Sequence, residues 1–303
     1  MIVNQRAEAL LTSTLVTDLS QPLGSSLLYV PHIADGGGFS SSLILSNTSG
    51  ATETGTISIL DDAGAPLSVQ SVGGTMGPTF SYSIPAAGTF VFQTDGSPSL
   101  VRAGWLKVTP DAGSNTPVGV GVLSSSLAGI LVTESGVPSS SPTTRARIYV
   151  DMSGSHDSGL AIDNPAGTPI AVTIQAFDTN GRSAGNGPVT VNLAANGHAG
   201  AFVRELISGL PVGFTGIADL TSSSPFVPLT VRALTNGRGD YLATTFPAAD
   251  LTQAAPTPIV FPQIADGGGY KTQFIFISAD GAATVSVNFV SDNGAALSLG
   301  QAP

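Results

Sequence analysis

The three histidines, His32, His156 and His198, are the first residues to consider for catalysis or metal binding. None of them has a second histidine at the spacing of a zinc motif. His156 and Asp157 follow two serines in Met152–Gly159, which are the residue types of a Ser-His-Asp site. Members of such a triad, however, come from separate loops, and the nucleophile needs both a base and a group that orients that base. We therefore interpret Met152–Gly159 as a loop between strands. We predict no catalytic, cofactor-binding or metal-binding residues and expect the chain not to be an enzyme.

The tetrapeptide Asp-Gly-Gly-Gly occurs twice, at Asp35–Gly38 and at Asp266–Gly269. Successive glycines indicate a backbone with positive φ, and an aspartate can cap such a turn through side-chain hydrogen bonds. The alternative is calcium, bound by Asp35 or Asp266 together with carbonyl oxygens. Calcium sites gather several carboxylates and only one is local here, so we expect no cofactor and keep calcium as the alternative. No lysine follows the glycines, which argues against a phosphate-binding loop.

Two tripeptides carry weaker functional signals. Arg238-Gly239-Asp240 has the sequence of the integrin-recognition motif and follows Asn236-Gly237, so it is predicted to lie at a hairpin tip. Asn47-Thr48-Ser49 has the sequence of a glycosylation site. Both tripeptides arise often by chance, and Gly-Arg-Gly-Asp is favourable turn chemistry by itself. We assign no role to either of them.

The composition excludes several classes of partner. The 303 residues include 20 acidic and 10 basic side chains, which give a net charge of −10. Binding to nucleic acid phosphates or to an anionic membrane needs the opposite charge. There is no cysteine, which excludes disulfides and thiolate chemistry. No apolar run approaches the roughly 18 residues of a membrane span, and no signal peptide is visible.

The elements that must position any site belong to internal repeats. Val30–Phe39 reappears as Phe261–Tyr270 at an offset of 231, and the match reaches Leu60–Gly64 against Val290–Gly294 at an offset of 230. A fainter copy lies between them at an offset of 117. It pairs Leu45–Gly50 with Ile162–Gly167, and Leu60–Gly64 with Phe177–Gly181. The long repeat is therefore interpreted as two diverged units, an A type and a B type, each of roughly 115 residues.

The ends of the chain fit the same pattern. Thr17–Pro22 precedes the first A unit as Ala249–Ala254 precedes the second. We predict a B-type tail at 1–26, an A-type sandwich at 27–140, a B-type sandwich at 141–250 and the front half of a second A unit at 251–303. Half a sandwich cannot close its core. We expect the chain to be an excerpt of a longer array, such as an incomplete reading frame. The alternative is that the half domain accepts a strand from a neighbouring repeat or a like chain.

The predicted fold class is all-β, with tandem immunoglobulin-like antiparallel sandwiches. With 37 glycines and 21 prolines, the chain favours short strands joined by tight turns. One helical turn is expected at Phe202–Ile207, and Trp105, Phe80, Tyr82, Phe90 and Phe92 are predicted to be core aromatics of the A unit. The predicted strands are Leu27–Pro31, Ser41–Ser46, Gly55–Leu60, Thr79–Ile84, Gly88–Gln93, Gly104–Thr109, Val118–Ser124 and Gly129–Glu134 in A, then Ile148–Asp151, Gly159–Asp163, Ala171–Phe177, Val189–Leu193, Ala199–Arg204, Gly216–Thr221, Leu229–Leu234 and Tyr241–Phe246 in B.

Two stretches carry a resemblance to known repeats. Phe261–Tyr270 and Phe214–Pro225 resemble repeats of large extracellular proteins of soil bacteria such as the Acidobacteria. The resemblance implies tandem immunoglobulin-like sandwiches that are secreted or displayed on a cell surface, and it implies no residue roles. We expect a non-catalytic structural or adhesive segment of a stalk or fibre. The alternative is a glycan- or protein-binding accessory module of a larger secreted enzyme. Exposed aromatic side chains on one face favour the glycan module, and buried ones favour the stalk.

Overall fold

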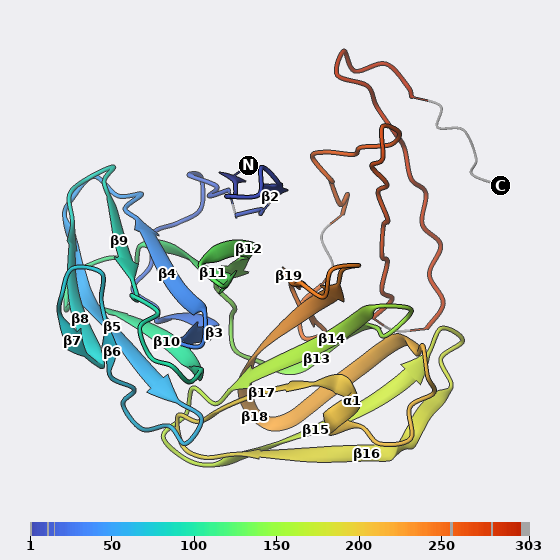
Figure 1. The fold of residues 1–303 in the computed structure, drawn as a ribbon, viewed down its shortest axis with the longest axis horizontal. Coiled ribbons are helices and arrows are strands. Elements are labelled where there is room, and N and C mark those ends of the chain that lie inside the picture. The colour runs from blue at the N-terminus through green and yellow to red at the C-terminus, as the bar shows by residue number, and fades with distance from the viewer. Residues whose placement is uncertain (1, 11, 15, 255–256, 280, 298–303) are drawn as a thin grey trace. The chain divides into compact units, whose positions relative to one another are not determined.

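A computed structural model describes residues 2–10, 12–14, 16–254, 257–279 and 281–297. Across these residues it is an antiparallel β structure with one four-residue helix (Figure 1), which confirms the predicted all-β sandwich class. The chain divides into two compact units, Met1–Ile259 and Val260–Pro303. None of the described helical residues forms a helix long and apolar enough to cross a membrane.

Sandwich A consists of two four-stranded sheets. One has the order β3-β10-β5-β8 and the other β12-β11-β4-β9. On β5, alternate side chains are buried, which is the pattern of a strand with one face on a core. Ile57 and Ile59 of β5 pack with Leu43 and Leu45 of β4 in that core. The strands are β3 (Leu28–Asp35), β4 (Phe39–Ser46), β5 (Glu53–Asp61), β8 (Thr79–Ile84), β9 (Thr89–Gln93), β10 (Arg102–Pro110), β11 (Val118–Leu127) and β12 (Ile130–Pro138), with a small β6 (Val69–Gln70) and β7 (Met76–Gly77) ribbon.

Sandwich B repeats this strand order. One sheet has the order β16-β15-β18-β13-β20, and in the other β18 and β17 flank β14 while β19 pairs with β18. The elements are β13 (Thr143–Asp151), β14 (His156–Asp163), β15 (Ile170–Asp178), β16 (Ser183–Leu193), β17 (His198–Phe202), α1 (Val203–Leu206), β18 (Thr215–Thr235), β19 (Tyr241–Phe246) and β20 (Ala249–Asp250). In each sandwich the first strand therefore pairs with the sixth, and the second strand lies between the fifth and the seventh, if the two halves of β18 are counted as the sixth and seventh strands of B.

This order differs from the immunoglobulin arrangement, most clearly at its first and seventh strands. In immunoglobulin domains the first strand lies beside the second, and the last strand lies beside the sixth. Here β3 pairs with β10 instead, and β11 takes the place beside β4. The first and the seventh strands have thus exchanged sheets relative to that order.

Two predicted strands of B are one continuous strand. β18 runs from Thr215 to Thr235 and crosses from one sheet to the other. Its first part pairs with β13 and β15, and its second part pairs with β14 and β19. The predicted break falls at 222–228, and within it the strand changes sheets without leaving extended geometry, since Phe226 still pairs with β13 and Val227 already pairs with β14. The predicted strand Ala199–Arg204 is also wrong at its end, because β17 stops at Phe202 and α1 begins at Val203.

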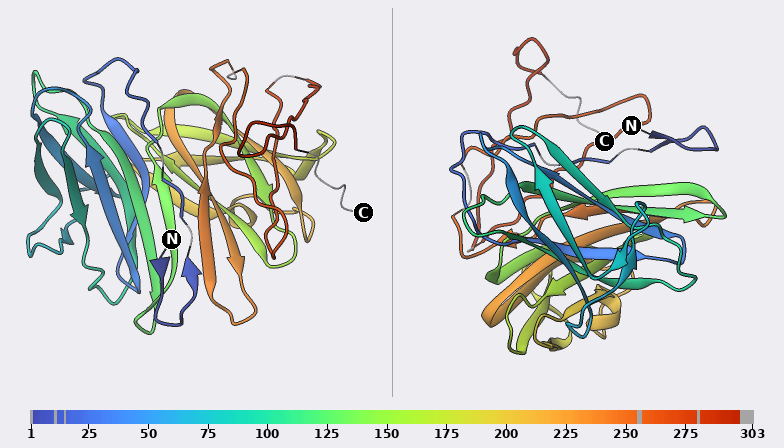
Figure 2. Two further views of the ribbon diagram at one scale, coloured as in Figure 1. Left: turned by 90° about the horizontal axis from the view of Figure 1, so that it is seen from above. Right: turned by 90° about the vertical axis from the view of Figure 1, so that its left-hand side faces the viewer.

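The two sandwiches pack against each other within the first unit (Figures 1 and 2). Ala161 and Leu229 of sandwich B belong to the same apolar cluster as the core of A. Trp105 was predicted to lie in the core of A, and that prediction is wrong. Its fully buried ring packs with Tyr29 and Val227 at the junction, because it lies on the outer face of β10. The outer faces of the two sandwiches are thus apolar where they meet.

A short hairpin precedes sandwich A. It consists of β1 (Ile2–Val3) and β2 (Ala9–Leu10). The amide of Gly136 on β12 donates to Oγ1 of Thr12 at 2.9 Å, and the carbonyl of Leu131 accepts from Nδ2 of Asn4 at 2.9 Å. The N-terminal segment therefore lies along β12 of sandwich A.

The second unit keeps the turns of the A repeat without its sheets. Gly267, Gly268 and Gly269 have φ values of 90°, 60° and 91°, matching 89°, 60° and 94° in the first copy. No strand is assigned in the described part of 260–297. The topology of A explains this, since β3, β4 and β5 never pair with one another but with β8 to β11. Counterparts of only the first three strands lie in residues 260–303, and those three cannot form a ladder by themselves.

Candidate functional site: the cavity between the sandwiches

A cavity of about 490 Å³ lies at the junction of the two sandwiches. Sandwich A contributes residues from β3, β4, β10, β11 and β12, and sandwich B contributes residues from β14, β17, α1, β18 and β19. Many of the positions around it carry small side chains, which leave the space open where the sheets approach. These are Ala34, Ala103, Gly159, Ala161, Gly200, Ala201 and Ala243. The volume falls in the range of small-molecule sites.

The rim of the cavity is fixed by hydrogen bonds between β12 and β19. Oγ of Ser135 donates to the carbonyl of Ala243 at 2.6 Å, and the amide of Ala243 donates to Oγ1 of Thr133 at 3.2 Å. Oγ1 of Thr245 donates to the carbonyl of Gly136. These bonds join one sandwich to the other through side-chain hydroxyls, so the two edges hold a defined separation.

His32 lies on the wall of the cavity at the end of a chain of three side chains. Its Nδ1 atom is 3.1 Å from Nε2 of His198, and Nδ1 of His198 is 2.7 Å from Oδ1 of Asp62. The two imidazole rings are stacked with centroids 5.2 Å apart. His32 and Asp62 belong to sandwich A, whereas His198 opens β17 of sandwich B. The chain of contacts therefore exists only when the sandwiches are joined.

The direction of the hydrogen bonds follows from Asp62. A carboxylate only accepts, so His198 donates from Nδ1, and when its ring carries a single proton its Nε2 is an acceptor. His32 must then donate from Nδ1, which leaves its Nε2 as an acceptor. Burial lowers the pKa of His32 to about 3, with the neighbouring His198 adding to the effect, and this keeps the ring neutral. The hydrogen bond from His198 holds the pKa of Asp62 below its usual value.

Sandwich B contributes Tyr241 and Glu205 to the same cavity. Burial raises the pKa of Tyr241, and the charge of Asp157 adds to this effect, so its hydroxyl stays protonated. Glu205 accepts the amide of Phe202 at 2.9 Å at the start of α1, and Arg204 forms an ion pair with Asp157 nearby. The charged groups around the cavity are thus mainly acidic or already paired.

Sequence reasoning missed the pairing of His32 with His198. The two residues are 166 positions apart and share no motif. One signal was present in the repeats, since Gln263 stands in the second A copy where His32 stands in the first. Because the second A copy has no histidine at this position, His32 is a candidate for a role that is specific to the first A copy.

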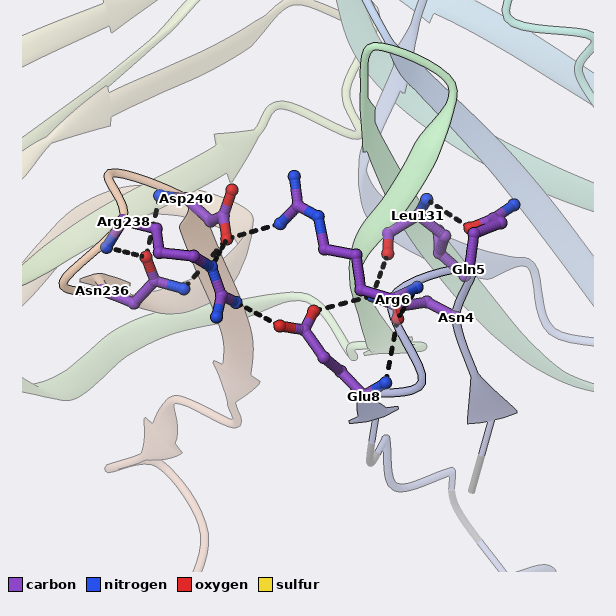
Figure 3. A network of polar contacts seen from close by, with 8 residues as sticks. All are labelled: Asn4, Gln5, Arg6, Glu8, Leu131, Asn236, Arg238 and Asp240. Atoms are coloured by element: carbon purple, nitrogen blue, oxygen red, sulfur yellow. Dashed lines mark hydrogen bonds and ion pairs between the residues drawn. The ribbon is translucent and has the colours of Figure 1, made fainter.

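A second cluster joins two copies of one hairpin turn (Figure 3). Oδ1 of Asn4 accepts the amides of Arg6 and Glu8, and Oδ1 of Asn236 accepts the amides of Arg238 and Asp240. The positive φ at Ala7 has its counterpart at Gly239. The two turns lie 232 positions apart and have the same hydrogen-bond pattern.

The two turns also bind each other reciprocally (Figure 3). Nη1 of Arg6 lies 2.9 Å from Oδ2 of Asp240, and Arg238 forms an ion pair with Glu8. Each arginine thus reaches the acid of the other turn. This arrangement also determines whether the Arg238-Gly239-Asp240 tripeptide is accessible to a receptor. The side chain of Asp240 is only 4% exposed and accepts hydrogen bonds from Arg6, Arg238 and Asn236, so it is not presented to a receptor.

The aspartate of the Asp-Gly-Gly-Gly loop of sandwich A does not cap the loop's own amides, which donate to backbone carbonyls instead, but binds the neighbouring segment between β9 and β10 and the start of β10. Oδ2 of Asp35 lies 2.6 Å from Nη2 of Arg102, and Oδ1 accepts the amide of Gly96 at 3.1 Å. Asp35 is fully buried. Both oxygens are engaged by protein donors, which is the structural role and not the arrangement of a calcium ligand. Asp266 in the second unit is exposed.

The other sequence candidates have local structural partners. Nδ1 of His156 lies 3.0 Å from the carbonyl of Ser153, and Asp157 faces Arg204, so the two do not form a triad with a serine. Asn47 is buried, and its Nδ2 donates to three backbone carbonyls. That amide is therefore not accessible for glycosylation in the folded chain.

Among the residues that the structure describes, no group of three or more His, Asp or Glu side chains is placed to hold a metal ion. A scan of the chain against protein-family models found no match. A search of curated proteins for relatives likewise found no match.

Proposed function

We propose that this chain is a non-catalytic structural or adhesive segment of an extracellular bacterial protein, in which sandwich pairs act as rigid building blocks. The junction at Trp105 is the observation that carries the proposal. The indole is fully buried, and its Nε1 donates to the carbonyl of Asn196 at 2.9 Å. A flexible pair of domains has a small polar interface, whereas an apolar interface of this kind resists bending.

The reciprocal turn pair supports the same proposal. The contact joins two copies of one repeat element that are separated by a whole A-plus-B period. Contacts between equivalent positions of successive repeats are how extended repeat proteins hold their shape. The contact resembles a symmetric two-fold interface, because each turn pairs its arginine with the acidic residue at the equivalent position of the other turn.

The placement of the aromatic side chains favours the stalk over a glycan platform. Within residues 16–254 every Phe, Tyr and Trp side chain is buried or half-buried. Sugar binding by stacking needs aromatic faces that are open to solvent. The alternative, a binding accessory module of a larger secreted enzyme, is supported instead by the cavity at the junction.

The proposal includes association with neighbouring repeats or with further copies of this chain. In sandwich A, β3, β4 and β5 pair with later strands of the same sandwich. The corresponding segments of the second unit form no strand ladder with any described residue of 260–297. Unpaired backbone edges accept strands from neighbouring repeats or like chains. Size-exclusion chromatography with light scattering on the full chain tests this. Concentration-dependent oligomers are expected, and a monomer at all concentrations would contradict strand addition.

The structural role is tested by limited proteolysis, small-angle scattering and surface labelling. The connection at Ser139–Pro142 between β12 and β13 is expected to resist cleavage in the native chain, and the scattering of residues 1–259 is expected to fit one rigid body. Antibody labelling of intact source cells is expected to find the protein outside. Rapid cleavage between the sandwiches, or a strictly internal location, would reject the proposal.

A further inference from the structure

The cavity at the junction has features that the packing of two sandwiches does not need. Adjacent sheets pack well when apolar side chains fill the space between them. Here the walls carry alanine and glycine, and the interior keeps about 490 Å³ of open volume. Elsewhere at the same junction Trp105 and Val227 fill the space completely. The junction is therefore well filled at one place and open at another.

The second feature is the imidazole at the wall. The side chain of His198 is wholly buried, and its two ring nitrogens form hydrogen bonds with Asp62 and His32. Nε2 of His32 has no hydrogen-bond partner among the described residues, and the chain of donors makes it an acceptor. Gly200 leaves room for the rings, since a Cβ there would lie 3.1 Å from Cε1 of His198 and 3.5 Å from Cε1 of His32.

The repeat shows that sandwich folding does not require this imidazole. The second A copy carries Gln263 at the position of His32 and keeps Asp292 at the position of Asp62. The hydroxyls of Thr133 and Ser135 at the cavity are already engaged with Ala243. Nε2 of His32 and the hydroxyls of Tyr241 and Ser125 are thus polar groups of the cavity that are without such a partner in the described part of the chain.

The charges around the cavity select against anions. Asp62 lies behind His32 and Glu205 lies at the cavity. Three arginines adjoin lining residues in the sequence, and each is paired with an aspartate: Arg102 with Asp35, Arg204 with Asp157 and Arg232 with Asp151. The whole chain carries a net charge of −10, which repels anions further. An occupant that matches this site is uncharged, mainly apolar and able to donate a hydrogen bond.

From these observations we infer that the cavity binds a small, uncharged, mainly apolar alcohol or phenol, whose hydroxyl donates to Nε2 of His32. The apolar walls supply most of the affinity and the hydrogen bond supplies orientation. This site goes beyond the structural role proposed above and does not depend on it, because a rigid stalk needs no ligand.

The test uses two probes of similar shape, 2-naphthol and 2-methoxynaphthalene, with binding to the full chain measured by titration calorimetry. Only the first can donate a hydrogen bond. Saturable binding of 2-naphthol with one site per chain is expected. Failure of both probes to bind at millimolar concentration would overturn the proposal.

Substitution at the wall locates the binding site. Ala103 shares the outer face of β10 with Trp105 and is half-buried, so Ala103→Leu places a larger side chain in the cavity. It is expected to weaken 2-naphthol binding by at least tenfold. Ala171→Leu makes the same change at an exposed position on β15 and is expected to leave binding unchanged. Equal effects of the two substitutions, or no effect of Ala103→Leu, would show that 2-naphthol binds outside the cavity and would overturn the proposal.

Substitution of the imidazole tests the hydrogen bond. His32→Phe keeps a planar ring and removes the acceptor. It is expected to weaken 2-naphthol about tenfold, the size of one hydrogen bond to a neutral partner, while 2-methoxynaphthalene changes less than about twofold on the same grounds. An equal loss for both probes would show that His32 acts through shape alone and would overturn the assigned role. Each variant is first checked for native Trp105 emission, which reports an intact junction.

Discussion

The indole nitrogen of Trp105 lies 2.9 Å from the backbone carbonyl of Asn196, and this bond joins β10 of sandwich A to the turn before β17 of sandwich B. Asn196 itself has a positive φ of 56°, which turns its carbonyl toward the neighbouring sandwich. Trp105 is the only tryptophan in the chain. Its fluorescence therefore reports directly on whether the two sandwiches remain joined.

Trp105→Phe is expected to lower the free energy of unfolding of the first unit by about 1–3 kcal/mol, because the carbonyl of Asn196 loses its donor inside the junction. Denaturant unfolding followed by circular dichroism measures this change. In the unaltered chain, tryptophan emission and circular dichroism are expected to change together on unfolding. An unchanged midpoint in the variant would show that the junction does not limit stability.

Gly64→Ala is expected to destabilise the chain much more than Gly181→Ala. The two glycines occupy equivalent turns and have φ values of 79° and 74°. A Cβ at Gly64 would lie 2.0 Å from the carbonyl oxygen of Ala195 across the junction, whereas nothing lies within 4 Å at Gly181. Positive-φ strain costs about 1–3 kcal/mol in both variants. Overpacking adds about 1–3 kcal/mol at Gly64 alone. Equal unfolding free energies for the two variants would contradict the close approach of the two turns.

The stability of the first unit is expected to fall as the pH drops from about 6.5 toward about 3. The folded pKa of His32 is lowered to about 3 from an ordinary value of 6.5, so the unfolded chain binds the extra proton in this window. The contribution is fully present above pH 6.5, and the limiting slope is about 1.4 kcal/mol per pH unit. His32→Gln, which introduces the residue of the second A copy, is expected to flatten the curve. The measurement is urea unfolding of both chains at several pH values.

Asp163→Asn is expected to have the opposite pH signature. Asp163 is fully buried, and neither oxygen has a partner among the described residues, so burial raises its pKa well above the usual value. Stability from the protonated form is present below about pH 4 and is lost as the pH rises through the folded pKa. The asparagine variant is therefore expected to gain stability relative to the unaltered chain as the pH rises. A difference between the two chains that is independent of pH would show that the carboxyl does not titrate.

Arg6→Ala is expected to loosen the N-terminal hairpin from the β18–β19 turn. Arg6 is one of three groups that bind Oδ2 of Asp240, and the other two remain in the variant. Hydrogen exchange of residues 2–10 is expected to become faster, while exchange in the core of sandwich A stays the same. Arg182→Ala, at an exposed turn, is the matched control. Unchanged exchange at 2–10 would mean that the reciprocal pairs do not hold the hairpin.

Much of the fold could be predicted because its signals are local. The alternating pattern of β5 and the glycines of the turns at Gly64 and Gly181 depend on neighbouring residues. The side chains that cap these turns are Asp61 and Asp178, each of which accepts amides two and four positions ahead. The continuous β18 was not predicted, since Ser222–Pro225 has the composition of a turn. Its extended geometry is imposed by β13 and β14, which hold its two halves in different sheets.

The candidate site could not be predicted in the same way. His32, Asp62 and His198 carry no spacing that marks them as a group, and two of them come from one sandwich and the third from the other. The sequence by itself determined the all-β class, the turn chemistry and the repeats, because these follow from residue periodicity and backbone preference. Only the tertiary structure decided that Trp105 joins two sandwiches, that Arg6 meets Asp240, and that an imidazole faces an open cavity. Those contacts depend on how outer faces of separate sheets meet, and no local rule of sequence specifies that meeting.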